Sequence, residues 1–426
     1  MAFGVSRDHF RFLLNRLKDK LWVKPLWMCL CSILAVAVAK MADYIDIEAF
    51  IYPISRDSIF ALLEIMASSM LMIATFSVGS MVSAYASAST SATPRAFSVI
   101  VADDVSKNAL SRFIGSFIFS IVSLTALHNE LFQSASLFVL FILTCVVFAL
   151  VILTFIRWVD RLARLGRVGS TIDSIEKVAM NALQKRKCSP TLAGASVQGN
   201  EKGEPVLATK VGYVQHIDMS CLQQWAETND VELLVASLPG DFVAPGRVLA
   251  YILTNKSADD QEFELDNLIT SFEIGQDRLF DDDPRFGMVV LSEIASKALS
   301  PGINDPGSSI KVITSLVRLF ASWCEPVDES DMTEISYDRV RVPKLEIADL
   351  CNDAFRPIAR DGAGCIEVVI QLQKSFSALY RIGDEPMKDA VKTHAQMSLK
   401  RSQLAFDLEE DLDVVRQASL FAKNLN

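Results

Sequence analysis

Four runs of apolar residues occupy the first 160 positions of the chain, and short segments rich in charged residues separate them. A helix that crosses a lipid bilayer needs about 20 predominantly apolar residues. The runs at 58–84, 109–127 and 131–156 have about that length, and the run at 25–39 reaches it when residues 21–24 are added. The small residues that end the first run imitate a signal-peptide cleavage site, but the leader before it is too long and too amphipathic for a signal peptide. The pattern therefore predicts a four-helix transmembrane domain at 21–160.

The second run, 58–84, differs from the others because polar residues recur along its length. Glu64 lies inside it, and small hydroxyl residues follow at three- and four-residue spacing, which places them on one helical face. Ser77, Ser80, Ser83 or Ala84, and Ser87 have this spacing, and Ser69 and Thr75 are further candidate residues of the same run. Small residues of this kind allow close helix packing, whereas in a symmetric ring the same face would line a water-filled pore. Glu64 likewise fits either an ion pathway or a hydrogen-bonded packing position.

Positive charges gather in the leader and directly after the fourth apolar run. Residues 6–20 mix apolar side chains with five cations, which predicts a basic amphipathic helix on the membrane surface, with a disordered leader as the alternative. The two loops on the opposite side carry only Lys40 and Arg56. The positive-inside rule then places both chain termini in the cytoplasm of a bacterium, with the four helices in its inner membrane.

Four residues are predicted to lie at the membrane interface, where aromatic side chains and long cationic ones keep their polar ends in water. They are Trp22, Arg112, Arg157 and Arg161. Arg112 sits near the start of the third run, so its side chain can reach the interface without a partner inside the membrane.

The remainder of the chain has ordinary globular composition and is expected in the cytoplasm. A helix at about 171–184 and a small, polar linker at 188–204 make up the segment 161–204. Residues 205–275 predict a small β module, in which strands at 211–218 and 231–237 flank a helix with Asp218 as its N-cap. The turns within 238–252 predict a tight β-hairpin. That hairpin resembles those of biotinyl- and lipoyl-type modules, but the modified lysine at the turn is absent.

Residues 276–426 predict a helical domain. Asp-Pro pairs at 283–284 and 305–306 indicate helix starts, because aspartate is a good N-cap and proline suits the first helical position. A strand at 339–347, two helices at 347–360 and 363–379, and one long helix at 386–421 complete the expected elements. The fold class is therefore an α-helical membrane protein with four transmembrane helices and a cytoplasmic α+β region.

Composition excludes several classes of function. The net charge of −10 arises in the C-terminal half, which argues against binding to nucleic acid. The eight cysteines form no CxxC pair and are expected to be reduced and mostly buried, and the four histidines do not cluster. The acidic run Asp281, Asp282 and Asp283 offers oxygen ligands for a divalent cation, but an N-cap and a solvated helix start explain it without a metal. No catalytic or nucleotide-binding motif is present, so neither enzymatic activity nor a cofactor is expected.

Four stretches, at 92–117, 212–222, 238–252 and 278–306, are similar to a bacterial family of predicted membrane proteins that is classified as a domain of unknown function. They read ATPRAFSVIVADDVSKNALSRFIGSF, GYVQHIDMSCL, LPGDFVAPGRVLAYI and RLFDDDPRFGMVVLSEIASKALSPGINDP. The resemblance covers nearly the whole chain, from the first apolar run to the last helix. It implies an inner-membrane protein with a cytoplasmic C-terminal region, and it brings no activity or site residues.

The functional expectation is an oligomeric, channel-like membrane protein. Four helices in one chain are too few to enclose a pathway, so a homo-oligomer in the lipid bilayer would line the pore with the second helix, while the cytoplasmic part would assemble or gate it. The sequence identifies no ion or small-molecule ligand. The alternative is a membrane-anchored interaction or signalling scaffold without a pore.

Overall fold

The computed structural model describes most of the chain as two compact units, one formed by residues 11–170 and the other beginning at Thr171. The described residues are 22–44, 54–91, 93–97, 99, 104–163, 166–197, 199, 203–254 and 263–419. The expected amphipathic leader at 6–20 lies outside them. The sequence predicted the end of the membrane domain at residue 160, and the N-terminal unit of the structure ends at Ser170.

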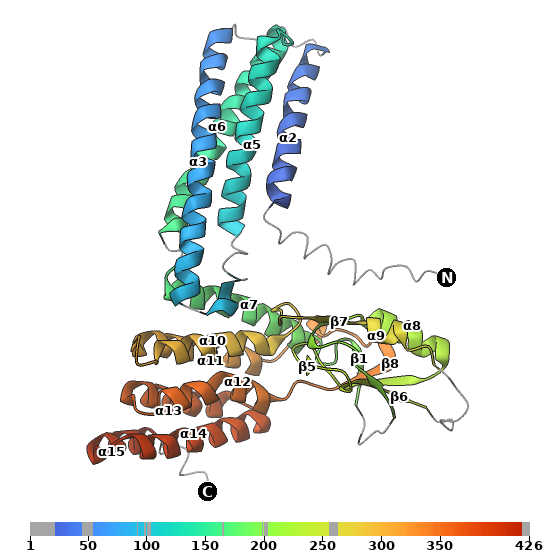
Figure 1. Ribbon diagram of the computed structural model, residues 1–426, viewed down its shortest axis with the longest axis vertical. Coiled ribbons are helices and arrows are strands. Elements are labelled where there is room, and N and C mark those ends of the chain that lie inside the picture. Colours follow the sequence, from blue (N-terminus) through green and yellow to red (C-terminus); the bar gives the residue numbers. More distant parts are fainter. Residues whose placement is uncertain are drawn as a thin grey trace. The chain divides into compact units, whose positions relative to one another are not determined.

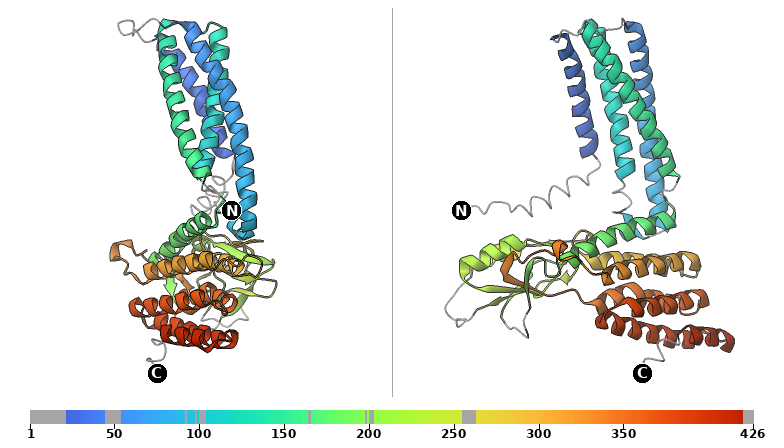
Figure 2. Two further views of the ribbon diagram at one scale, coloured as in Figure 1. Left: turned by 90° about the vertical axis from the view of Figure 1, so that its left-hand side faces the viewer. Right: turned by 180° about the vertical axis from the view of Figure 1, so that it is seen from behind.

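Four long helices form the N-terminal unit within its described residues (Figures 1 and 2). They are α2 (Val23–Met41), α3 (Arg56–Ser91), α5 (Asp104–His128) and α6 (Ser134–Leu162), and a short 3₁₀ turn, η3 (Pro94–Ala96), lies between α3 and α5. Each contains a stretch that is long and apolar enough to cross a membrane. The four apolar runs of the sequence therefore correspond to four helices, and α3 is longer at both ends than the run at 58–84.

Helix α5 is the centre of the bundle, because it packs against α2, α3 and α6. Small residues allow this packing: a Cβ added at Gly115 would lie 3.0 Å from the Cβ of Met28, and Ser32 Oγ donates a hydrogen bond to the Gly115 carbonyl at 2.8 Å. Ser116, Ser120 and Ser123 of α5 are all buried. Among the described helices of this unit, α5 thus carries more buried hydroxyls than any other, although the sequence pattern had not identified it as polar.

Polar contacts hold one end of the bundle together. Asp43, in the 3₁₀ turn η1 (Ala42–Tyr44), accepts hydrogen bonds from the Ser136 N–H at 2.9 Å and from Lys40 Nζ at 2.8 Å. Arg56 donates to the carbonyl of Phe132 at 3.0 Å. These bonds satisfy N–H groups at the start of α6 and tie the ends of α2 and α3 to it.

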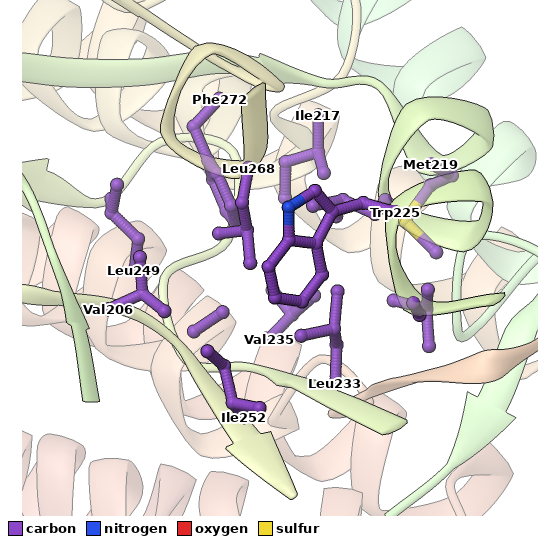
Figure 3. Packing of buried hydrophobic residues seen from close by; sticks show 14 of the residues in the cluster. Val206, Ile217, Met219, Trp225, Leu233, Val235, Leu249, Ile252, Leu268 and Phe272 are labelled. Carbon is purple, nitrogen blue, oxygen red and sulfur yellow. The ribbon is translucent and has the colours of Figure 1, made fainter. Parts of the chain in front are cut away.

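The C-terminal unit contains a β module of two sheets. One sheet has the strand order β1-β8-β4-β6-β2 and the other β5-β3-β7. The strands are β1 (Gly194–Ser196), β2 (Glu204–Leu207), β3 (Gly212–Ile217), β4 (Glu232–Val235), β5 (Phe242–Val243), β6 (Val248–Leu253), β7 (Phe272–Gly275) and β8 (Tyr337–Val342), and the helices are α8 (Met219–Asn229) and α9 (Asp266–Thr270). Trp225 of α8 fills the core beside Leu233 and Leu268 (Figure 3), and its Nε1 donates to the Glu264 carbonyl at 3.1 Å. Asp218 caps α8 as predicted, accepting from the Cys221 N–H at 3.0 Å.

Two expectations for this module are wrong. Residues 238–252 do not form a hairpin, because β5 pairs with β3 while β6 pairs with β2 and β4, so the turn passes the chain from one sheet to the other. The module is also not confined to 205–275: β1 arises within the expected linker, and β8 enters between β1 and β4 from a position much later in the chain.

Helices α7 and α10–α15 make up the rest of the unit. They are α7 (Val168–Cys188), α10 (Pro284–Ala298), α11 (Pro306–Cys324), α12 (Ile347–Asp361), α13 (Ile366–Ile382), α14 (Glu385–Ala405) and α15 (Glu409–Ala418), with a 3₁₀ turn η5 (Glu329–Asp331) after α11. Helices α10 to α15 stack in successive pairs (Figure 1), with α10 packed on α11 and α12, and α13 on α11 and α14. The starts of α10 and α11 are capped by Asp283 and Asp305 as predicted.

The long helix expected at 386–421 is divided. Phe406 ends α14 in an extended backbone conformation, and α15 begins at Glu409. The break lets α15 pack against both α13 and α14 and bury Leu412 and Val415. The burial of these two apolar side chains stabilises the arrangement in which α15 follows a break.

Candidate functional site

Helix α3 has two different faces within the N-terminal unit. Residues at three- and four-residue spacing are buried against the bundle: Ile59, Leu63, Met66, Met70, Ala74, Ser77, Met81 and Tyr85. The opposite side is exposed and mostly apolar, with Ile65, Leu71, Met72, Phe76 and Val82 among its exposed side chains. The polar or small residues between them, which we name the α3 polar face, are Glu64, Ser68, Thr75, Gly79, Ser83 and Ser87. The described helices of the bundle leave this face uncovered.

The structure distributes the predicted stripe over both sides of the helix. Ser77 is fully buried, and its Oγ has no hydrogen-bond partner. Ser69 and Ser80 are half-buried, whereas Glu64, Thr75, Ser83 and Ser87 are exposed. A serine pattern with mixed three- and four-residue spacing drifts around the helix, so spacing alone could not identify which members face outward.

Two hydroxyl groups on this face donate hydrogen bonds to carbonyls of their own helix. Ser68 Oγ donates to the Glu64 carbonyl at 2.9 Å, and Thr75 Oγ1 to the Leu71 carbonyl at 2.9 Å. A Cβ added at Gly79 would meet no atom within 4 Å. Two shallow grooves follow the face, of about 520 Å³ beside Thr75 and about 620 Å³ beside Gly79 and Ser83. The grooves are open, and the large apolar side chains of Leu71, Met72 and Phe76 line them together with the small and polar residues.

The depth of Glu64 follows from the geometry of the helix. At 1.5 Å per residue, Glu64 lies about 12 Å along α3 from Arg56, and Gly79 about 35 Å. Arg56 marks the polar end of the bundle, where its Nη1 lies 3.9 Å from Glu130 Oε1. A hydrocarbon core is about 30 Å thick, so the distance from Arg56 to Glu64 along the helix is less than half of that thickness.

The four predicted interface residues differ in their surroundings. Trp22 is 57% exposed and Arg157 is exposed, while Arg161 is half-buried. Arg112 Nη1 donates a hydrogen bond to Thr154 Oγ1 of α6 at 2.8 Å. Its head group is thus bound to a neighbouring helix, which the expectation of an anchor without a partner did not include.

In the C-terminal unit, Asp282 and Asp283 join the β module to the helices through ion pairs. Asp282 contacts Lys185 Nζ through Oδ1 and lies 2.6 Å from His216 Nδ1 through Oδ2. Burial by itself would raise the pKa of Asp282, but the hydrogen bond from His216 and the charge of Lys185 outweigh it and hold the pKa at about 2. This carboxylate is therefore ionised and bound by two partners.

Asp283 is bound even more completely. Arg278 donates to its two oxygens at 2.7 and 3.0 Å, and the backbone N–H groups of Arg285 and Phe286 donate to Oδ1. Asp281 is exposed. Among the described residues, no group of three or more histidine, cysteine, aspartate or glutamate side chains is arranged to hold a metal ion. The acidic run acts as a helix cap and an ion-pair centre.

All eight cysteines are free thiols. The expectation that most of them are buried is wrong, because Cys351 alone among them is buried and the others are half-buried or exposed. Burial raises the pKa of the Cys351 thiol to about 12, so it is protonated and unreactive at neutral pH.

A cavity of about 870 Å³ opens between the end of α7, the end of α11 and the first turns of α12 and α14. Its apolar lining includes Pro190, Trp323, Leu345, Ile347 and Ala390. The charged lining consists of Arg186, Lys187, Lys344, Glu346, Asp384 and Asp389. Ligand sites of proteins have this size and this mixture of apolar surface with a few polar groups.

Two polar side chains of the cavity are deeply buried. Arg186 is 4% exposed, and its Nε and Nη1 have no hydrogen-bond partner. Burial lowers the pKa of Arg186 to about 10 against the attraction of Asp282 and Asp283. His394 is 3% exposed, its Nδ1 has no partner, and burial together with the charges of Arg356 and Arg401 lowers its pKa to about 4. No sequence pattern pointed to either residue, since Arg186 is one cation among several at the end of α7.

Comparisons with known proteins connect the chain to uncharacterised bacterial proteins. Uncharacterised proteins of Mycobacterium tuberculosis and Mycobacterium bovis are each 26% identical to it over 227 residues, an alignment that covers 50% of this chain and 42% of each relative. The chain thus spans less than half the length of the curated relatives it matches. No solved structure matches it. A family model described as a predicted membrane protein, DUF2254, matches residues 18–378. That match covers well over half of the chain, which therefore belongs to the DUF2254 family of predicted membrane proteins.

Proposed function

We propose that this membrane protein assembles into a ring of identical chains in which the α3 polar face of each copy lines a shared pathway for a cation or a small polar solute. The observation that carries the proposal is the position of Glu64 on the uncovered side of a helix that is otherwise apolar enough to span a bilayer.

The free energy of a charged Glu64 side chain is lower in contact with water than in contact with lipid. A charged side chain near the centre of a spanning helix costs about 3 kcal/mol on insertion scales. Facing lipid, Glu64 would bear that cost in every copy. In a ring, the carboxylates would face water instead, and acidic rings of this kind favour cations.

Among the described helices, the interior of a single bundle offers α3 no such surrounding. Its buried face packs Met70 and Ala74 against Phe113 and Trp158. The ring of Trp158 contacts those of Phe76 and Phe113 edge to face, with ring centroids 6.1 and 6.2 Å apart. These aromatic contacts lie between α3, α5 and α6, which supports a pathway between copies over one inside a single bundle.

The same proposal assigns the sides of the membrane. Cations follow α6 and precede α2, so both termini and the C-terminal unit are placed in the cytoplasm of a bacterium, with the four helices in the inner membrane. On that side the C-terminal unit would assemble or gate the ring.

Flux through proteoliposomes containing the full-length protein tests the proposal. The wild type is expected to pass K⁺, Glu64→Gln to lose its preference for cations over anions, and Gly79→Leu to block flux by filling the open side of the face. Ser77→Ala is the matched control, because it changes a small residue of the same helix on the buried face. Absence of flux by the wild type at all voltages and pH values tried, or full flux by Gly79→Leu, would refute the proposal.

The second candidate is a membrane-anchored signalling scaffold, and the cavity in the C-terminal unit favours it because a sensor needs a ligand site. The oligomeric state in a mild detergent distinguishes the two functions. A ring of roughly four or more copies supports the pathway, whereas a monomer or a simple dimer supports the scaffold.

A further inference from the structure

We propose that the cavity between α7, α11, α12 and α14 binds a small organic anion whose carboxylate or phosphate group pairs with Arg186 and whose apolar body lies against Trp323 and Leu345. The site lies wholly within the C-terminal unit, so the proposal is independent of the pathway along α3.

Arg186 is the first reason. A guanidinium group has five N–H donors, and a buried one that makes no hydrogen bond is strongly disfavoured. Here Nε and Nη1 are both buried and without a partner, in a side chain that lines a cavity large enough for a ligand. A bound anion would accept these hydrogen bonds, and its negative charge would pair with the guanidinium group.

The nearby carboxylates do not supply it. Asp282 and Asp283 attract Arg186 through space, but neither accepts a hydrogen bond from its Nε or Nη1. The oxygens of Asp282 are bound by Lys185 and His216. Those of Asp283 are bound by Arg278 and two backbone N–H groups. Both acids are thus engaged elsewhere, and the guanidinium group remains available.

The start of α12 adds a second donor surface. Its N-cap residue, Glu346, makes no side-chain capping hydrogen bond, and Ile347 and Ala348 of the first turn line the cavity. Free N–H groups at the N-terminus of a helix of this length favour an anion. The neighbouring α14 differs, because its N-cap Asp384 accepts from the Met387 N–H at 3.1 Å. The uncapped helix and Arg186 border the same cavity.

The remaining lining residues define the rest of the ligand. His394 is neutral at pH 7, and its buried Nδ1 has no partner, so a hydroxyl or amide group of the ligand would complete it. Glu346, Asp384 and Asp389 carry negative charge, but all three are exposed, so water screens them more than the buried Arg186. Their presence restricts the ligand to few negative charges, which favours a monoanion or a simple phosphate ester over a polyanion.

Thermal unfolding of the full-length protein in nanodiscs, measured with benzoate, phenyl phosphate, inorganic phosphate and neutral phenol as probes, tests the proposal. A saturable rise in Tm of about 5 °C at a hundredfold excess over Kd is expected for benzoate or phenyl phosphate. Whichever of the two acts at lower concentration identifies the anionic group. Inorganic phosphate lacks the apolar body and phenol lacks the charge, so both are expected to give smaller shifts.

Two variants locate the site. Arg186→Gln is expected to abolish the rise in Tm without lowering Tm in the absence of the anion, because it removes a buried cation that has no hydrogen bond. If Arg186 had a purely structural role, its replacement would lower Tm in the absence of the anion. Ala348→Trp narrows the exposed mouth of the cavity and is expected to abolish the rise even if Arg186→Gln does not fold. Arg318→Gln, which breaks the ion pair with Glu176 outside the cavity, is the control and should retain it.

Three results would overturn the proposal. They are no saturable shift with either organic anion, an equal shift with phenol, and an unchanged shift in the folded variants Arg186→Gln and Ala348→Trp.

Discussion

Acidification is expected to destabilise the C-terminal unit through His394 before most carboxylates are protonated. The imidazole lies among the rings of Phe355 and Phe376, with ring centroids 6.4 and 6.3 Å away, and its Nδ1 has no hydrogen-bond partner. Burial, with the charges of Arg356 and Arg401, lowers the pKa of His394 from 6.5 to about 4. The unfolded chain therefore takes up a proton at a pH at which the folded chain resists it.

The sign and size of the effect follow from this difference. Stability due to the neutral imidazole is fully present above pH 6.5, and it is lost as pH falls from 6.5 to about 4. At about 1.4 kcal/mol per pH unit, the total loss in the free energy of unfolding is about 3 kcal/mol. Below that range both states bind the proton, and His394 makes no further contribution to the pH dependence.

Replacing His394 by leucine isolates the contribution, because leucine has a similar volume and Nδ1 makes no bond that would be lost. Thermal unfolding of the full-length protein between pH 7.5 and 4 is the assay. Relative to His394→Leu, the wild type is expected to lose about 6–12 °C in Tm over this range, using 2–4 °C for each kcal/mol. His128→Gln, at an exposed histidine, is the control and should behave like the wild type.

Parallel curves of Tm against pH for the wild type and His394→Leu would refute this reasoning. Such a result would mean that the imidazole gains a proton in the folded state at its ordinary pKa, and that the side chain is solvated.

Three further predictions concern packing, ion pairing and thiol chemistry in the C-terminal unit. Gly287→Ala places a methyl group closer to Ala179 of α7 than real contacts allow, so it should lower the free energy of unfolding by about 1–3 kcal/mol in chemical denaturation. Gly302→Ala is the control, because the added atom meets nothing within 4 Å, and it should leave the free energy of unfolding nearly unchanged. Asp283→Ala removes the cap of α10 and leaves Arg278 unpaired, so the free energy of unfolding should fall by about 3–5 kcal/mol in the same measurement. A fall of less than about 1 kcal/mol would contradict the ion-pair role of Asp283. Cys351 should remain unlabelled by a maleimide until the protein is denatured, and labelling of this thiol in the folded protein would contradict its burial.

The helix caps were predictable because their chemistry is local. An aspartate followed by proline at 283–284 and 305–306 offers a side-chain acceptor and a residue that needs no hydrogen bond, whatever the rest of the chain does. Asp218 acts in the same way at the start of α8. The failed hairpin at 238–252 depended instead on partners far away in sequence, since β3 and β4 take up the two arms separately.

The candidate sites show the same difference between local features and contacts of distant residues. The sequence identified Glu64 and the polar character of α3, because a carboxylate among apolar residues is visible without a fold. It could not separate Ser77, which is buried, from Thr75 and Ser83, which are exposed, because that depends on where α5 and α6 pack. It also gave no sign of Arg186 or His394, whose importance arises from burial against helices distant in sequence.

The sequence by itself determined which segments can cross a membrane, because partition into lipid depends on the summed composition of about 20 consecutive residues. It likewise determined most helix starts and the separation into an apolar N-terminal part and a globular remainder. Only the tertiary structure decided that β8 pairs with β1 in one sheet, that α15 packs on α13 and α14 and buries Leu412 and Val415, and that Arg186 lines a cavity. The physical reason is that strand pairing, helix packing and the desolvation of a charge depend on residues brought together from distant parts of the chain.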